Sequence, residues 1–522
     1  MKKIKFFTKP KLLLGLVMLT AAAIGVVSCN KVNEHVYSQI TTSNFFQTAS
    51  QVESAYVQPY SFIATHIYQV HFALAEFATD EAVCPERYGY IDQDGMWNRL
   101  HQHNWTTDDA WIATEWNDMY QAIGYANYFI DAIQNVDVSK MDLPVSKAQM
   151  IAEAKMIRDL HYYWLLDEFG NVPIVEHIGV VNPPTVARAD VYAYLVKDIN
   201  ANMPQLSHKG DANWYGHFTQ EAAHALLAKI YLNAQVFTGT QQYAACITEC
   251  DAIINSGKFS LDATWDAPFL AHNENSAENI FVVPFDSQHA IGFNAAQQQI
   301  HWDEAPPKYG ISDGWAKVVS QESFYDLYAK NDLRINQWLV GPQTYVDQTT
   351  GKTEPVIDDD GNQLTLTPQI QSLGEDGADN AYSGAANVKY QIEYGIYNMN
   401  NDLVVFRLGD IMDMKAECEM RQNGGVATAD AVGLVNQVRA RSFKPGAIGS
   451  TYTTATLTLD ELLDERGREF SYEMKRREDM IRFGHFNDAW WEKPATDKHY
   501  ELYPIPYSAT TGNSALKQNP GY

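Results

Sequence analysis

The residues Thr219-Gln-Glu-Ala-Ala-His-Ala-Leu-Leu-Ala-Lys-Ile-Tyr-Leu-Asn233 repeat apolar side chains with the period of an α-helix. The break Thr238-Gly239-Thr240 separates them from a second helical stretch, residues 243–254, which is ended by Gly257. Small residues recur where the two helices would touch. They are Ala222, Ala225, Ala228, Ala244, Ala245 and Ala252. The pattern predicts a helix pair of the tetratricopeptide-like kind, although the strict consensus repeat is absent.

Helical periodicity extends on both sides of this pair, over about residues 48–257. The further helices expected here are residues 111–136, 146–169 and 189–202. Ser146 is placed to cap the second of them, and Gly170-Asn-Val-Pro173 is placed to stop it. The first half of the chain is therefore predicted to be a scaffold of packed helices.

Residues 258–400 differ in character, because Gly, Asn, Asp, Gln and Pro are dense and helical periodicity is lost apart from residues 321–330. Asp358-Asp-Asp-Gly-Asn362 lies between two extended runs, 353–357 and 363–367, and predicts a hairpin turn. Long irregular segments held by a helical scaffold are a usual place for binding residues.

Helices return at residues 408–422, 429–442 and 459–483. The last is expected to begin at the capping box Thr458-Leu-Asp-Glu461 and to end at Gly484. Charged residues of alternating sign follow one another along it at spacings of three and four. They are Arg466, Glu469, Glu473, Arg476, Arg477 and Asp479. A solvated charged face and a buried Arg–Glu network both fit this pattern.

Composition bounds the function. The chain has 522 residues, which suits one large composite domain or two to three ordinary ones, and 46% apolar with 20% charged residues is a globular composition. Lys and Arg number 38 against 64 Asp and Glu, a formal net charge of −26. So acidic a chain repels phosphate backbones, which argues against nucleic acid as a partner.

The N-terminus predicts export and a lipid anchor. Five lysines precede the apolar stretch 12–27, which is short for a bilayer span and fits a secretory signal. The stretch ends in Val26-Val27-Ser28-Cys29, which resembles a bacterial lipobox. We expect residues 1–28 to be a lipoprotein signal peptide and Cys29 to be the lipidated N-terminus of a chain that is anchored to a membrane and does not span it.

The remaining cysteines and a histidine pair were considered as metal ligands. Cys84, Cys246, Cys250 and Cys418 are too few for a disulfide framework. Cys246 and Cys250 share one helical face and fit small buried residues at a helix contact better than a zinc site. His101 and His103 lack a third ligand in the sequence. We therefore expect no metal and no cofactor.

Several segments, in order, resemble the SusD/RagB family of Bacteroidetes outer-membrane nutrient-binding lipoproteins, and the resemblance covers essentially all of residues 30–522. The segments are Asn44–Thr48, Glu153–Arg158, Phe169–Pro173, Ala225–Leu232, Val404–Asp410, Leu434–Arg441, Glu465–Glu469, Tyr503–Pro506 and the terminal Leu516–Tyr522. Asn30-Lys-Val-Asn-Glu34 is a weak version of the acidic export signal of such lipoproteins, so surface and periplasmic orientations both stay open.

The resemblance implies a mostly α fold in one composite domain. Four tetratricopeptide-like helix pairs would form a scaffold packed against a loop-rich part with a few short strands. The division expected is a helical part at 29–257, a loop-rich insertion at 258–400 and C-terminal helices at 401–522. The implied role is a lid on a SusC-like TonB-dependent barrel that captures oligosaccharide at the outer membrane, or peptide in members of the RagB type.

A non-catalytic sugar site needs aromatic faces for pyranose rings and planar polar groups for hydroxyls. Two loops offer both, residues 80–99 and residues 301–315. The aromatic platforms expected are Trp97, Trp302, Tyr309 and Trp315. The hydrogen-bonding partners expected are Asp80, Arg87, Asn98 and Arg99. Each could instead be a ring or charge that packs its own loop.

A lipid-anchored glycoside hydrolase is the competing class, and it needs two carboxylates flanking a cleft. Adjacent acids such as Asp167-Glu168 occur, but chance provides such pairs in a chain with 64 acidic residues. The sequence also contains no Gly-x-Ser-x-Gly, zincin or phosphate-loop motif. It therefore favours capture without catalysis, and glycan over peptide because both candidate loops are rich in tryptophan.

Overall fold

The computed structural model describes residues 45–87, 95–374 and 381–522. The predicted signal peptide and Cys29 lie outside these residues. Contacts divide the chain after Thr48, and Ala49–Tyr522 forms one unit, which holds every element named below. Among the described residues, no helix is both long and apolar enough to cross a bilayer.

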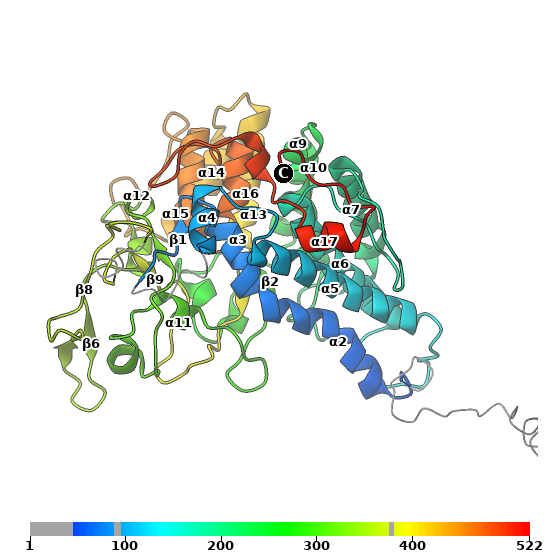
Figure 1. The fold of residues 1–522 in the computed structure, drawn as a ribbon, viewed down its shortest axis with the longest axis horizontal. Helices are drawn as coiled ribbons and strands as arrows, with labels where there is room; N and C mark the ends of the chain where they lie inside the picture. Colours follow the sequence, from blue (N-terminus) through cyan, green and yellow to red (C-terminus); the bar gives the residue numbers. More distant parts are fainter. Residues whose placement is uncertain (1–44, 88–94, 375–380) are drawn as a thin grey trace, which may run out of the picture. The chain divides into compact units, whose positions relative to one another are not determined.

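The first half of this unit is helical, as its periodicity predicts (Figure 1). Its helices are α2 (Ala49–His66), the π-turn η1 (Ile67–His71), α3 (Phe72–Glu76), α4 (Met96–Gln102), α5 (Ala110–Ile133), α6 (Lys147–Glu168), α7 (Arg188–Asn202), α8 (Gln220–Leu232), α9 (Ala234–Thr238) and α10 (Tyr243–Ile254). Ser146 caps α6 as expected, since its hydroxyl accepts the Gln149 backbone N–H at 3.2 Å.

Small residues let these helices pack closely. Helix α5 lies along α6, and α10 packs against both α8 and the later helix α13 (Leu408–Gln422). Ala222, Ala225 and Ala228 of α8 are fully buried. Cys246 and Cys250 are buried on one face of α10 with their Sγ atoms 4.0 Å apart. The interpretation of this thiol pair as small residues at a helix contact is thereby confirmed.

The middle of the chain is loop-rich, and the described residues contain short strands that lie mostly in this region, with one strand earlier in the chain. They are β1 (Ala82–Val83), β2 (Asn279–Val283), β3 (Val319–Ser320), β4 (Trp338–Leu339), β5 (Gly341–Pro342), β6 (Thr344–Val346), β7 (Thr353–Pro355), β8 (Thr365–Leu366), β9 (Ala386–Asn387) and β10 (Leu403–Arg407). All pair antiparallel in two-stranded sheets: β1 with β3, β2 with β10, β4 with β9, β5 with β8 and β6 with β7. The hairpin turn at 358–362 is confirmed, because the Asp358 N–H donates to the Asn362 carbonyl at 2.9 Å.

Two short helices interrupt this region, α11 (Ala295–Gln299) and α12 (Glu322–Tyr325). The helix expected over residues 321–330 is therefore wrong for most of its length. The chain turns after α12 so that Tyr328 enters the core, where its hydroxyl donates to the Arg468 carbonyl at 3.1 Å. Burial of this ring outweighs the local helical tendency.

The C-terminal part contains α13, α14 (Ala429–Ala440), α15 (Leu459–Phe470), α16 (Arg476–Phe483) and α17 (Tyr507–Gly512), which packs beside α5 (Figure 1). The single helix expected over residues 459–483 is wrong, because the chain breaks between α15 and α16. Tyr472 and Met474 adopt left-handed backbone angles, φ 60° and 59°. Their N–H groups donate to the buried carboxylates of Glu81 and Glu76, which hold the break against the N-terminal helices.

The alternating charges around this break form a buried network. The six charged residues that the sequence places there, at 466, 469, 473, 476, 477 and 479, are each at most 4% exposed. Arg407 lies among them and is fully buried; its guanidinium donates to Glu473 at 2.8 Å and to Glu469 at 2.9 Å. Of the two interpretations left open by the sequence, the buried network is confirmed and the solvated face is wrong.

Candidate functional site

Two segments of the loop-rich region, one that carries Trp302 and one that carries Trp315, lie side by side. The Ala316 N–H donates to the Ile300 carbonyl at 2.9 Å. Gly314 sits so close that a Cβ there would come within 2.5 Å of the Ile300 carbonyl oxygen. Only glycine permits this approach, so Gly314 allows the segments that carry the two predicted tryptophans to lie side by side.

Trp315 is the most accessible of the predicted platforms, with 38% of its surface exposed. Its indole N–H points at Asp313 (3.4 Å), and its backbone N–H donates to the Gln297 carbonyl at 2.6 Å. The Gln297 side-chain amide in turn donates to the Tyr397 carbonyl at 2.6 Å. Gln297 therefore anchors Trp315 and Tyr397 together.

Tyr394 and Tyr397 were not predicted as platforms, yet they are 54% and 39% exposed beside the predicted loop. The Gly395 N–H donates to the Tyr309 carbonyl at 2.8 Å, and Gly310 packs directly against the Tyr394 ring. We call Trp315, Tyr394 and Tyr397 the aromatic surface. The tyrosines recur at residues 390, 394 and 397 around Gly395, and this tyrosine–glycine run was the signal available in the sequence.

Two further predicted platforms are half-buried. Trp302 lies against the buried imidazole of His301, with ring centroids 3.9 Å apart, and His301 stacks on Tyr382 at 5.5 Å. Burial and the nearby Arg87 charge lower the pKa of His301 to about 3, so the ring between these aromatics is neutral. Tyr309 packs against the core and has the Lys308 ammonium 5.2 Å from its ring centroid.

The prediction of Trp97 as an exposed aromatic platform is corrected, because the structure places this residue inside the fold. Helix α4 turns its indole inward, where 1% of the residue is exposed. The ring meets Trp111 and Phe77 edge-on at centroid distances of 4.6 and 5.2 Å, and the Lys317 ammonium lies 4.4 Å over it. Trp97 has no face left for a ligand in this structure and serves as core.

Asp80 and Arg87 are also tied into the fold. Both carboxylate oxygens of Asp80 accept from Arg476 at 2.7 Å. Arg87 is 2% exposed and donates to the Ser383 carbonyl at 2.6 Å, and burial lowers its pKa to about 10. Arg87 is thus withdrawn from solvent, and the partly exposed Asp80 carboxylate is occupied by Arg476.

Asn98 and Arg99 are less buried but likewise engaged. The Asn98 amide donates to the Leu373 carbonyl at 3.4 Å, and the Arg99 Nε donates to Asp109 at 2.8 Å. Residues 88–94, which complete this loop, lie outside the described part of the chain. Among the described residues of the two predicted loops, the exposed aromatic face comes from residues 301–315.

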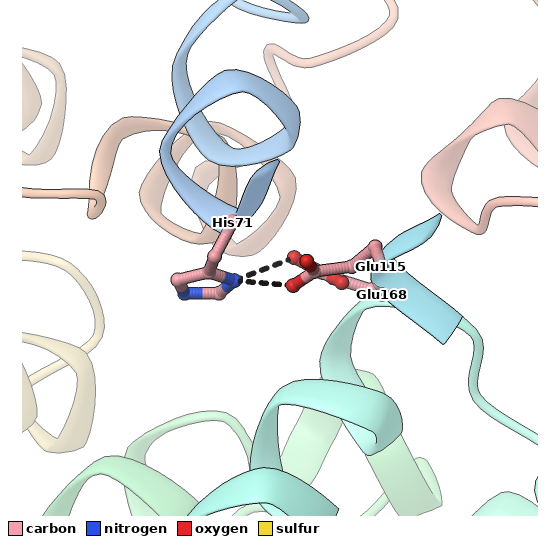
Figure 2. A group of neighbouring side chains, drawn as sticks. All are labelled: His71, Glu115 and Glu168. Carbon is pink, nitrogen blue, oxygen red and sulfur yellow. Dashed lines mark hydrogen bonds and ion pairs between the residues drawn. The ribbon is translucent and has the colours of Figure 1, made fainter. Parts of the chain in front are cut away.

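A buried histidine–glutamate cluster was missed by the sequence reasoning. His71 of η1, Glu115 of α5 and Glu168 of α6 converge, and Figure 2 shows one imidazole nitrogen facing both carboxylates. The distances from His71 Nδ1 to the Oε1 atoms of Glu115 and Glu168 are 3.0 and 3.1 Å. Burial alone would lower the pKa of His71, but these two carboxylates raise it to about 10. Because 44 and 53 residues separate the members, no short motif could reveal the group.

His101 and His103, the histidine pair noted in the sequence, bond to backbone carbonyl groups. His101 Nε2 lies 2.7 Å from the Trp491 carbonyl, and His103 Nε2 lies 2.8 Å from the Ala78 carbonyl. Burial lowers the pKa of both rings, to about 4 for His101 and about 2 for His103. Each is a neutral core histidine bonded to backbone.

A cavity among the described residues has a volume of about 490 Å³ and is lined by none of the predicted residues. It lies between α2 and β2 with the loop that follows β2, and Tyr60, Tyr68, Tyr215 and His217 line it. An exposed platform for a long sugar needs no enclosed cavity, so the aromatic surface stays the primary candidate.

Family models match most of the chain. The model described as "SusD family" matches residues 278–522, and the model described as "Starch-binding associating with outer membrane" matches residues 54–232. The starch-binding protein SusD of Bacteroides thetaiotaomicron is 26% identical over 500 residues, covering 87% of this chain and 86% of its own. A SusD-like protein of Bacteroides ovatus is 23% identical over 416 residues, covering 74% and 69%.

Solved structures share the fold. A SusD homologue from Bacteroides thetaiotaomicron superposes with a TM-score of 0.72 at 18% identity, covering 92% of this chain and 98% of its own. The surface glycan-binding protein A of the same organism, in complex with laminarihexaose, gives 0.67 at 20% identity, covering 90% and 99%. The mostly helical fold expected from the sequence is confirmed.

Proposed function

The chain belongs to the SusD/RagB family, and from this premise we propose that it is a non-catalytic lipoprotein that captures oligosaccharide at the outer membrane. The observation that carries the proposal is the aromatic surface of Trp315, Tyr394 and Tyr397, whose rings are exposed on a fixed backbone. Exposed aromatic rings of this size are costly to leave in water, and Trp315 and Tyr397 share Asp313 as a hydrogen-bond partner, which favours a binding surface here.

The chemistry of this surface suits a sugar. The apolar faces of pyranose rings stack on aromatic rings, and the hydroxyl edges need hydrogen-bond acceptors nearby. Asp313 lies beside the Trp315 indole and hydrogen-bonds Tyr397, which places a carboxylate at the edge of the platform. Trp302, half-buried against His301, lies on the adjacent segment and adds a further aromatic ring.

The relatives support the same class of ligand. One is named as starch-binding, and one structural neighbour holds laminarihexaose. These names are those of binding proteins, which supports capture without bond cleavage. A peptide ligand of the RagB type is the second candidate, and the exposed tyrosines would serve it as well.

Anchoring and delivery complete the proposal. Lipidation of Cys29 would hold the protein at the outer membrane, which the description of the matching family model supports. A SusC-like TonB-dependent barrel is the proposed recipient of the captured glycan. A Cys29→Ala chain is expected to lose its membrane association in cell fractionation, and a chain that stays membrane-bound would contradict the lipid anchor.

Calorimetric titration of the purified protein tests capture. Malto-oligosaccharides, laminarihexaose and a casein peptide digest are the probes. Trp315→Ala and Tyr394→Ala should each weaken binding of the recognised glycan about tenfold, which corresponds to about 1.4 kcal/mol. Tyr507→Ala is the matched control, because Tyr507 is 60% exposed on α17 and outside the aromatic surface. The proposal would be overturned if both site variants kept the parent affinity, or if only the peptide digest bound. It would also be overturned if chromatography of the glycan after incubation with the protein showed shortened products.

A further inference from the structure

The cluster of His71, Glu115 and Glu168 has the geometry of a metal site. Its ligand atoms come from η1, α5 and α6 and all lie within 4.8 Å of one another. In tetrahedral zinc sites the bonds of about 2.0–2.2 Å to nitrogen and oxygen put neighbouring ligand atoms about 3.3 Å apart. The observed separations of 3.0 and 3.1 Å from His71 Nδ1 to the two carboxylates are within a few tenths of that value.

The carboxylates of this cluster are short of partners. Glu115 and Glu168 are 0% and 2% exposed, and the Oε2 atom of each is buried with no hydrogen-bond partner. An ionised carboxylate buried in this way is costly unless it is paired or coordinates a metal. A single proton on His71 Nδ1 can be donated well to only one of them, whereas one divalent ion would neutralise both.

Three nearby basic residues are closest to other carboxylates, although the Arg477 charge also acts on Glu168. The Lys229 ammonium pairs with Glu478 at 3.0 Å, and the Arg477 guanidinium pairs with Asp167 at 2.6 Å. Lys475 lies 3.6 Å from Asp410. His71 is accordingly the group that faces Glu115 and Glu168 together, and its ring is held in place by Trp164 at a centroid distance of 4.4 Å.

Space for a further ligand adjoins the cluster. A cavity of about 40 Å³ is lined by His71 and Glu168. That volume is enough for one water molecule. Three protein ligands plus a water make up a common four-coordinate zinc arrangement. The second nitrogen of His71 points away from the carboxylates, so Nδ1 can bind a metal while Nε2 keeps the proton (Figure 2).

We propose that His71, Glu115 and Glu168 form a buried binding site for a divalent transition-metal ion of the zinc class. The ion would join η1, α5 and α6 and stabilise the N-terminal helices. It would sit where η1 interrupts the regular α-helical turn, a type of bulge that is common at functional sites. The metal site is independent of glycan capture.

The test begins with the full purified protein stripped with a chelator. Zinc, cobalt and calcium ions are added separately, with bound metal measured by mass spectrometry and stability by thermal unfolding. We expect one zinc ion per chain, a melting temperature raised by about 2 °C or more at saturating zinc, and a cobalt spectrum of low coordination number. Calcium should bind far more weakly, because the site offers an imidazole nitrogen and only two carboxylates.

Variants locate the ion. Glu115→Gln and Glu168→Gln keep the side-chain shape and should each weaken zinc binding at least 100-fold. Asp131→Asn is the matched control, because Asp131 pairs with the exposed His177 at 2.7 Å in another His–carboxylate pair, and it should bind zinc as the parent does. A parent protein that retains no zinc and shows no thermal shift overturns the proposal, as does zinc binding that survives in both glutamine variants. If the variants do not fold, the metal content and thermal shift of the parent still decide.

Discussion

Arg407 lies at the centre of the buried charge network, and removing it should destabilise the protein more than any surface ion pair. Its guanidinium is fully buried and donates to Glu473 (2.8 Å), Glu278 (2.7 Å) and Glu469 (2.9 Å). Arg407→Met keeps the aliphatic length but leaves these carboxylates without their shared counter-charge. Breaking a buried ion pair from one side costs about 3–5 kcal/mol, a large part of a typical total stability of about 5–15 kcal/mol.

Urea unfolding followed by circular dichroism and by tryptophan fluorescence measures this loss. We expect the midpoint to fall by about 0.5–1 M, since urea slopes are about 1–3 kcal/mol per M in small proteins and increase with the surface exposed on unfolding. Lys498→Met is the control: its ammonium is 4.0 Å from Glu501 with the side chain 85% exposed, and its midpoint should match the parent. A midpoint for Arg407→Met within error of that control would refute the view that this network holds the C-terminal helices together.

Three smaller predictions follow from other contacts. Burial would raise the pKa of Glu465, but three arginines hold it at about 2, so the ionised carboxylate stabilises the folded protein fully above about pH 4.5 and loses this effect as the pH falls toward 2. Glu465→Gln should therefore lower the urea midpoint clearly at pH 7 and much less at pH 3. An equal loss at both pH values would contradict the assignment. Gly310 has φ +67°, and a Cβ there would lie 2.8 Å from the Tyr394 ring. Gly310→Ala should therefore displace that ring and weaken glycan binding in titration several-fold while the protein stays folded. A variant that binds glycan as the parent does would exclude Tyr394 from the site. Ser146→Ala removes the cap of α6 and should cost about 1 kcal/mol in thermal unfolding, whereas no change would show that this cap is dispensable.

Periodicity was sufficient for most of the long helices, but not for residues 321–330 or for the break between α15 and α16. Residues 459–483 carry a continuous helical pattern with a cap at each end. The chain nevertheless turns at Tyr472 and Met474, because Glu81 and Glu76 accept their N–H groups from a part of the chain almost 400 residues earlier. A tertiary contact of that kind leaves no local trace in the sequence.

The candidate site was predicted in part. Trp302 and Trp315 could be singled out because they lie in a loop rich in Gly, Pro and Asp, and the structure places them on adjacent segments. Trp97 could not be separated from them, since its burial depends on Trp111 and Phe77, which only the fold brings to it. Tyr394 lies about 80 residues beyond the predicted loop, so only the folded chain shows that its ring packs against Gly310 of that loop.

The hydrogen bonds from the break at Tyr472 to Glu76 and Glu81 have a consequence for folding during synthesis. Glu76 and Glu81 emerge from the ribosome long before the amides that they bind, and until then their final burial would strand two carboxylates in an apolar interior. The opening helices therefore cannot settle while the chain is still being made. A protein assembled in this order stays open until its C-terminal part has been made.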